Sequence, residues 1–255
     1  MPAIRFKTQT WAGETAAGAV LAFVSRSINK AKQCCTLLTV VPMHKLKQSE
    51  DFMQPVLIVA VLIQILASTT LVSKKTDVEL AIYLAAKALI QGGIHEDGLL
   101  DLADASSQRT KTSRLKVMKG TKTGAFGSLV LALASALEYV ALKPLANTSL
   151  VKVTAVCSLI SWSSVLWHWI ALPHAFDSYS VVMHRTNAIA CALVTAAALF
   201  VNFKSVQALV TAVYLVVLNV LFNMWTLKKI GGRTGDTLGA IKKLSEVLST
   251  VCLSP

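Results

Sequence analysis

The sequence predicts an all-α fold, a polytopic integral membrane bundle of about six to seven transmembrane helices. Of its 255 residues, 54% are hydrophobic and only 15% are charged, whereas roughly a quarter of the residues of a soluble domain are charged. Several apolar stretches approach the length of about 20 residues that crosses a bilayer. Basic residues collect between these stretches, as the positive-inside rule expects.

Six apolar stretches are the strongest candidates for membrane spans. Some are short or carry one charge, such as Lys87, Glu138 or Lys152, which we interpret as tilting, snorkelling or burial against neighbouring helices. The C-terminal stretch Ile241–Leu253 is weakly amphipathic, and we expect a helix there but not a crossing. In chain order the predicted spans are Pro55–Val72, Val78–Ile94, Ala125–Leu145, Leu150–Leu172, Asn187–Val201 and Ser205–Trp225.

No linker, low-complexity block or fixed-period repeat divides the chain. We therefore predict a basic N-terminal leader over residues 1–32 and a single membrane-embedded domain over residues 33–255. The net charge is +12, but the basic residues do not form a recognition helix with interleaved aromatic residues. We expect membrane lipid rather than nucleic acid around this chain.

Two basic segments indicate how the bundle is oriented. Arg109–Lys122 holds six Lys or Arg residues, and Lys228–Arg233 adds three. Four predicted spans separate the two segments, so both should lie on one face of the membrane, the cytoplasmic one. The loop Pro173–Arg185 falls on this face too, whereas Lys74 and Lys75 fall on the opposite one.

An acidic run near position 100 is the first candidate site. Four of the chain's 13 acidic residues are Glu96, Asp97, Asp101 and Asp104. On a helix the three aspartates share one face, where like charges repel unless a cation lies between them. Mg²⁺ prefers oxygen ligands and is usually held by one or two carboxylates plus substrate phosphates. We predict a metal–phosphate site on these aspartates, with a solvated helix face as the alternative.

The neighbours of the acidic run extend the predicted site. His95 is a candidate general base, metal ligand or hydrogen-bond partner of Asp97, and the alternative is a histidine at the lipid headgroups. His168 and His174 flank a Trp-rich span end, which is typical of an aromatic belt. Three glycines would let the backbone approach a bulky ligand closely: Gly92, Gly93 and Gly98.

A second polar motif, GGRTGDTLGA, occupies residues 231–240. Successive glycines with exposed N–H groups can bind an anion, and Arg233 can pair bidentately with a phosphate. Thr234 and Gly235 belong to the same predicted phosphate site. Asp236 would complete the metal site, because the expected topology brings both motifs to one membrane face. A glycine-rich turn after a membrane helix is the alternative.

With both motifs in hand, the chain resembles the cobalamin (5′-phosphate) synthase family, the adenosylcobinamide-GDP ribazoletransferases. The first family signature is matched from Gly92 through Asp104, and the C-terminal one is matched by residues 231–240. A middle segment is matched loosely by MKGTKTGAFG at residues 118–127. Order and spacing agree over roughly residues 30–253.

The chain departs from the family pattern at a few positions. Gly120 stands where the family usually has Asp. Lys122 stands where the family has Arg, which keeps the charge but not the bidentate geometry. Arginines usual near Ser161 and after Pro-His-Ala are missing, and Phe176 occupies the second position. We expect these changes to bear on activity.

The resemblance implies an enzyme that joins adenosylcobinamide-GDP to α-ribazole or its 5′-phosphate, releases GMP and needs Mg²⁺. It implies a multi-pass protein of the bacterial inner membrane whose active site faces the cytoplasm, and association with other cobalamin-synthesis enzymes is a further expectation. Either His95 or Asp104 would be the general base. The implied Mg²⁺ ligands are Asp97, Asp101, Asp104 and Asp236, and the implied phosphate-binding residues include Lys122, Gly124 and Arg233.

Three other functions are compatible with parts of the sequence. A membrane CDP-alcohol phosphotransferase also binds metal through acidic helix residues, but its D-G-x-x-A-R stretch is not met after Asp97-Gly98. A transporter could carry a cation or proton on membrane carboxylates. A non-catalytic remnant is suggested by Gly120 and by the missing arginines.

Overall fold

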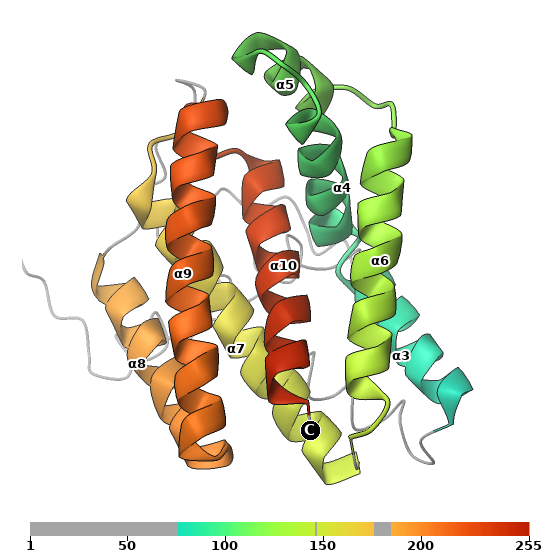
Figure 1. Cartoon of the computed structure of the whole chain (residues 1–255), viewed down its shortest axis with the longest axis vertical. Helices are drawn as coiled ribbons and strands as arrows, with labels where there is room; N and C mark the ends of the chain where they lie inside the picture. The colour runs from blue at the N-terminus through green and yellow to red at the C-terminus, as the bar shows by residue number, and fades with distance from the viewer. Residues whose placement is uncertain (1–75, 146, 176–184, 255) are drawn as a thin grey trace, which may run out of the picture.

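The structure is a computed structural model that describes residues 76–145, 147–175 and 185–254. Within these ranges the chain forms eight helices and no strand, which confirms the predicted all-α bundle (Figure 1). The predicted leader, the predicted span Pro55–Val72 and Phe176 lie outside the described residues. The helices are α3 (Asp77–Ile90), α4 (Ile94–Ser106), α5 (Lys111–Met118), α6 (Ala125–Leu142), α7 (Asn147–Ala171), α8 (Arg185–Asn202), α9 (Ser205–Lys229) and α10 (Gly235–Leu253).

Three of these helices are long and apolar enough to cross a membrane, so the chain is a multi-pass membrane protein. They cover Ala125–Leu142, Leu150–Ala171 and Ser205–Lys229, where spans were predicted. In α8 the apolar part, Ile189–Asn202, is shorter. Large apolar side chains remain exposed along α6 and α9, as expected of surfaces that face lipid; they include Leu133, Val140, Leu209 and Leu221.

The predicted span Val78–Ile94 is wrong as one continuous helix. α3 ends at Ile90, and α4 begins at Ile94. Between them Gly92 and Gly93 adopt φ angles of 68° and 65°, a left-handed conformation that glycine adopts readily and other residues rarely. The two glycines therefore break the apolar stretch and redirect the chain into the acidic helix.

The C-terminal helix occupies the centre of the bundle. The sequence predicted a helix over Ile241–Leu253, and the structure extends it to Gly235–Leu253. α10 packs against α4, α6, α7 and α9 (Figure 1), and most of its side chains are buried, including Ile241 and Val247. Weak amphipathicity thus arises from burial on nearly all sides rather than from a position on the membrane surface.

Both basic segments lie at one end of the bundle, as predicted. Figure 1 places α5 and the turn between α9 and α10 at the top of the view. The Nη1 atom of Arg114 donates to the carbonyl oxygen of Lys229 at 3.5 Å. The described start of the 173–185 loop joins them, because the Ala175 N–H donates to the Arg233 carbonyl at 2.9 Å. Four helices, α6 to α9, separate the two segments in sequence.

Helices α4 and α10 approach so closely that their crossing requires glycine. A Cβ atom added to Gly98 would lie 2.7 Å from the backbone oxygen of Asp236 and 3.0 Å from the Cα of Gly239. A Cβ added to Gly239 would lie 2.9 Å from the backbone oxygen of Ile94. Small residues allow this kind of backbone contact between membrane helices, and here they bring the acidic helix against the start of α10.

We expect Gly98→Ala and Gly239→Ala each to destabilise the protein by about 1–3 kcal/mol, the usual cost of overpacking a close contact. Thermal unfolding in detergent would measure the loss. Gly235→Ala is the matched control, because nothing lies within 4 Å of a Cβ added there. Equal stability of Gly98→Ala and Gly235→Ala would show that the crossing tolerates a side chain.

Candidate active site

The candidate site is built from one turn of α10 and two turns of α4. Asp97 and Asp101 stand one above the other on α4, as residues four apart do. Asp236 lies in the first turn of α10, where its charge is favourable at the helix N-terminus. Because the backbones meet at Gly98 and Asp236, the structure brings the two sequence motifs together.

The three carboxylates disturb one another electrostatically. Burial raises the pKa of Asp101 to about 6, and the neighbouring charges of Asp97 and Asp104 add to the effect. Burial likewise raises the pKa of Asp236 to about 6, with further contributions from Asp101 and Asp97. Within the described residues none of Asp97, Asp101 and Asp236 forms an ion pair. The site therefore holds uncompensated negative charge.

This cluster fits a divalent cation that shares its ligands with a substrate. Among the described residues, no three His, Cys, Asp or Glu side chains are grouped closely enough to hold a metal by themselves. Mg²⁺ does not need such a set, because it usually keeps several waters and takes one or two carboxylates plus phosphates. Asp97, Asp101 and Asp236 supply oxygen donors with unpaired charge, which suits that mode of binding.

Asp104, a predicted metal ligand and base, is engaged elsewhere in the structure. Its two carboxylate oxygens accept the N–H groups of Gly124 and Gly127, each at 2.7 Å. Gly124 is the N-cap of α6, so the carboxylate caps that helix from a neighbouring one. Asp104 and Gly124, both predicted site residues, thus join α4 to the start of α6.

His95 is buried on another face of α4. Its side chain is 5% exposed, and its ring meets Trp162 edge-on with centroids 5.6 Å apart. Neither ring nitrogen has a hydrogen-bond partner in the described part of the chain. Burial, followed by the charge of Lys242, lowers the pKa of His95. The imidazole is therefore neutral and does not point toward the carboxylates on α4.

Arg233 and Thr234 stabilise helix ends. Arg233 Nη1 donates to the carbonyl oxygen of Trp169 at 2.9 Å and to that of Leu172, and its guanidinium lies 4.8 Å from the Trp169 ring centroid. Thr234 is the N-cap of α10 and accepts the N–H of Thr237 at 3.2 Å. Both predicted phosphate-binding residues therefore hold the turn that presents Asp236.

Exposed lysines lie at the same end of the bundle. Lys122 is exposed in the segment between α5 and α6. Sequence reasoning did not single out Lys111, although it begins the basic helix α5. A Cβ atom added to Gly231 would collide with the ammonium group of Lys111, so this group lies next to the first glycine of the predicted phosphate motif. The signal was the basic run itself, in which nothing distinguished one lysine from the others.

His168 is a second residue that sequence reasoning missed. It was interpreted as part of an aromatic belt, and the structure shows instead a fully buried side chain. Its Nδ1 atom is hydrogen-bonded to Asn223 on α9, and its Nε2 atom is 3.0 Å from the Thr237 hydroxyl on α10. His168 therefore anchors the residue next to Asp236 to two membrane helices.

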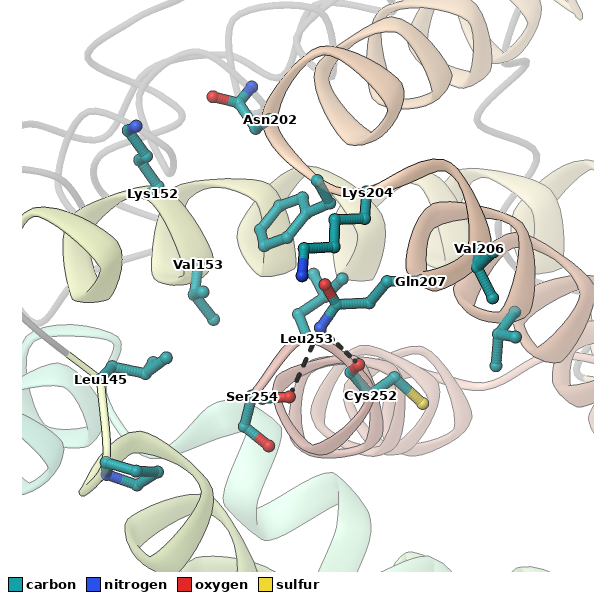
Figure 2. A pocket seen from close by; sticks show the side chains of 13 residues that line it. Leu145, Lys152, Val153, Asn202, Lys204, Val206, Gln207, Cys252, Leu253 and Ser254 are labelled. Atoms are coloured by element: carbon teal, nitrogen blue, oxygen red, sulfur yellow. Dashed lines mark hydrogen bonds between the residues drawn. The ribbon is translucent and has the colours of Figure 1, made fainter.

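A cavity of about 840 Å³ lies at the opposite end of the bundle and does not belong to this site (Figure 2). It is formed by the end of α10, the start of α7 and the turn between α8 and α9. Gln207 crosses it to donate to the carbonyl oxygens of Cys252 and Ser254, at 3.3 and 3.4 Å. No carboxylate of the candidate site lines this cavity.

Comparison with known proteins agrees with both motifs. A family model described as cobalamin-5-phosphate synthase matches residues 30–254. The chain is 30% identical over 180 residues to an adenosylcobinamide-GDP ribazoletransferase of Shewanella piezotolerans, covering 67% of this chain and 70% of that protein. It is 31% identical to one of Rhizobium etli, covering 71% and 75%, respectively. No solved structure matches the chain significantly.

The raised pKa of Asp236 predicts how stability depends on pH without metal. Its folded-state pKa, about 6, lies above the ordinary value of 3.8, so ionisation destabilises the fold fully above about pH 6 and the penalty disappears near pH 4. We expect the melting temperature of metal-free protein to rise between about pH 7 and pH 5, and to rise less in Asp236→Asn. If the melting temperatures of the two proteins change with pH in the same way, the raised pKa of Asp236 is contradicted.

Proposed function

Because the chain belongs to the cobalamin-5-phosphate synthase family, we propose that it is an adenosylcobinamide-GDP ribazoletransferase. It joins adenosylcobinamide-GDP to α-ribazole, or to its 5′-phosphate, and releases GMP in the nucleotide-loop assembly step of cobalamin synthesis. The observation that carries the proposal is that both matched motifs, at 92–104 and 231–240, meet where α4 crosses α10.

The reaction sets clear demands on the site. A ribose hydroxyl of the α-ribazole partner attacks the phosphorus that carries the cobinamide. A new phosphorus–oxygen bond forms while the bond to the oxygen bridging toward guanosine breaks, so GMP leaves with that oxygen and its electron pair. The hydroxyl proton must be taken up. The site must also neutralise the diphosphate and align nucleophile and leaving group.

The uncompensated carboxylates support a metal-dependent version of this reaction. Two of the three carboxylates of Asp97, Asp101 and Asp236 would hold Mg²⁺ together with the substrate's phosphates, which leaves the third free of metal. When bound, Mg²⁺ supplies positive charge that offsets the charge of the diphosphate. The capping bonds of Asp104 give it instead the task of fixing α4 against α6.

A carboxylate left free of metal is the best candidate for the general base. Asp101 and Asp236 have a pKa of about 6. Near neutral pH such a carboxylate is largely ionised and is still basic enough to accept a proton. His95 is buried on another face, and Asp104 uses both oxygens for N–H groups. We therefore favour Asp101 or Asp236 over those two earlier candidates.

The phosphate-binding cations are proposed to be the exposed lysines at this end of the bundle. Lys122 and Lys111 are free to reach a ligand, whereas Arg233 is occupied with the end of α7. With Gly120 and Lys122 where the family usually has Asp and Arg, binding relies more on point charge than on bidentate contacts.

The proposed setting is the bacterial inner membrane, with the carboxylates toward the cytoplasm. Support comes from the basic segments 109–122 and 228–233, which lie at that end of the bundle and which the positive-inside rule places in the cytoplasm. Lipid would cover the exposed apolar faces of α6 and α9. Association with other cobalamin-synthesis enzymes stays a prediction.

Purified protein should form GMP and a cobamide from adenosylcobinamide-GDP, α-ribazole and Mg²⁺. We expect Asp101→Asn and Asp236→Asn to lower the rate about 100-fold or more, the loss typical of removing one electrostatic group from a reacting site. Asp77→Asn is the control, because Asp77 forms an exposed ion pair with Lys143 away from the site. Turnover of a CDP-linked donor in place of the GDP-linked one would refute the assignment.

A further inference from the structure

Six charged side chains meet inside the bundle, three lysines and three glutamates from α3, α4, α6 and α10. Five of them are at most 4% exposed, and the sixth, Glu96, is 14% exposed. We call this set the buried charge cluster. Its members are Lys87, Glu96, Glu138, Lys242, Lys243 and Glu246.

Every member of the buried charge cluster has a partner of opposite charge. Lys87 pairs with Glu138, and lies 3.4 Å from Glu246. Lys242 lies 2.9 Å from Glu246 and donates to Gln91 at 3.1 Å. The charges sum to zero, which makes burial tolerable, because an unpaired buried charge is very costly. Buried ion pairs nevertheless add little stability compared with apolar residues, and their best-attested use is to fix register.

Lys243 is the member that connects the cluster to the candidate site. Its ammonium group lies 3.0 Å from Glu96 on α4 and 2.9 Å from Glu138 on α6. Glu96 directly precedes Asp97, and Lys243 follows Asp236 by about two helical turns. The ion pair therefore ties the two helices that carry the repelling carboxylates, close to the point where they cross.

The glycine contact alone does not fix how α4 is placed along α10. Gly98 and Gly239 let the backbones approach, but a smooth crossing of small residues can slide. The negative charges of Asp97, Asp101 and Asp236 push the same two helices apart. A directional, buried link is needed to hold them in one register, and within the described residues Lys243–Glu96 is the ion pair that joins α4 to α10.

We propose that Lys243, acting through Glu96, is a positioning residue that sets the separation of Asp236 from Asp97 and Asp101 and thereby the affinity of the site for a divalent cation. The inference takes its divalent cation from the proposed function, whereas the Lys243–Glu96 link between α4 and α10 does not depend on that function. Lys242 offers a comparison, because it is similarly buried on the same helix and pairs with Gln91 and Glu246, which lie outside α4.

Two double variants separate positioning from charge balance. Glu96→Gln with Lys243→Met removes one cation and one anion and cuts the link between α4 and α10. Lys242→Met with Glu246→Gln also removes one of each and leaves that link intact. Both keep the buried charge cluster neutral, so each should insert and fold. Lys243→Arg keeps the charge and should restore the link.

Three measurements on the detergent-solubilised full chain decide the matter: Mn²⁺ affinity by electron paramagnetic resonance, hydrogen–deuterium exchange of α4, and the melting temperature. We expect the first double variant to bind Mn²⁺ about 10-fold more weakly or worse, as when a supporting contact of a metal ligand is lost, with faster exchange in residues 94–106. The second double variant and Lys243→Arg should resemble wild type in both respects.

The possible failures can be told apart. If both double variants match each other in Mn²⁺ affinity and in α4 exchange, Lys243 has no positioning role and the inference is overturned. If wild type does not bind Mn²⁺ in the absence of substrate, α4 exchange alone decides the positioning role, and the dependence of GMP formation on Mg²⁺ decides the metal of the proposed function. Should the first double variant not fold, Lys243→Met alone is compared with Lys242→Met by the same exchange measurement.

Discussion

The close crossing of α4 and α10 is the constraint on which the rest of the structure depends. It buries carboxylates beside one another, and this burial, together with their mutual repulsion, raises the pKa values of Asp101 and Asp236. Only glycine allows the approach, at Gly98 and Gly239. Much of the surrounding architecture, including the hydrogen bonds of His168 and the link from Lys243, holds this unfavourable arrangement in place.

A polar helix can lie at the centre of a membrane bundle because its buried lysine, serine and threonine side chains find partners. Ser245 and Thr250 donate to carbonyl oxygens one turn earlier on α10, at 2.6 and 2.8 Å. Lys243 pairs with glutamates of α4 and α6, and Lys242 pairs with Glu246 on α10 itself. Since hydrocarbon offers no hydrogen bonds, such a helix is stable only when surrounded by protein. This explains why α6, α8 and α9 carry the exposed apolar surfaces while α10 carries almost none.

The sequence was sufficient for the all-α class, for the three long spans and for the meeting of the two motifs, because apolar length and charge placement are direct consequences of bilayer physics. It failed at Val78–Ile94, where apolar composition masked the backbone conformation of two glycines. It predicted the C-terminal helix but not its central position or the role of His168, because hydropathy averages over side chains and does not reveal which polar groups pair across helices. Lys87 and Glu138 were recognised as unusual charges, but their pairing with each other and with residues of α10 could not be deduced from one sequence.

The polar residues of the two motifs divide into three that stabilise helix ends and three whose carboxylates remain available for chemistry. Asp104 caps α6, Thr234 caps α10, and Arg233 binds the last carbonyls of α7. These three polar residues satisfy helix ends, which would otherwise leave backbone groups unpaired in a low-dielectric setting. Asp97, Asp101 and Asp236 form no ion pair within the described chain, and burial together with neighbouring negative charge makes the ionised forms of Asp101 and Asp236 costly. Charged side chains that destabilise a fold are expected to bind a ligand that is not part of the protein. For these carboxylates the ligand must carry positive charge.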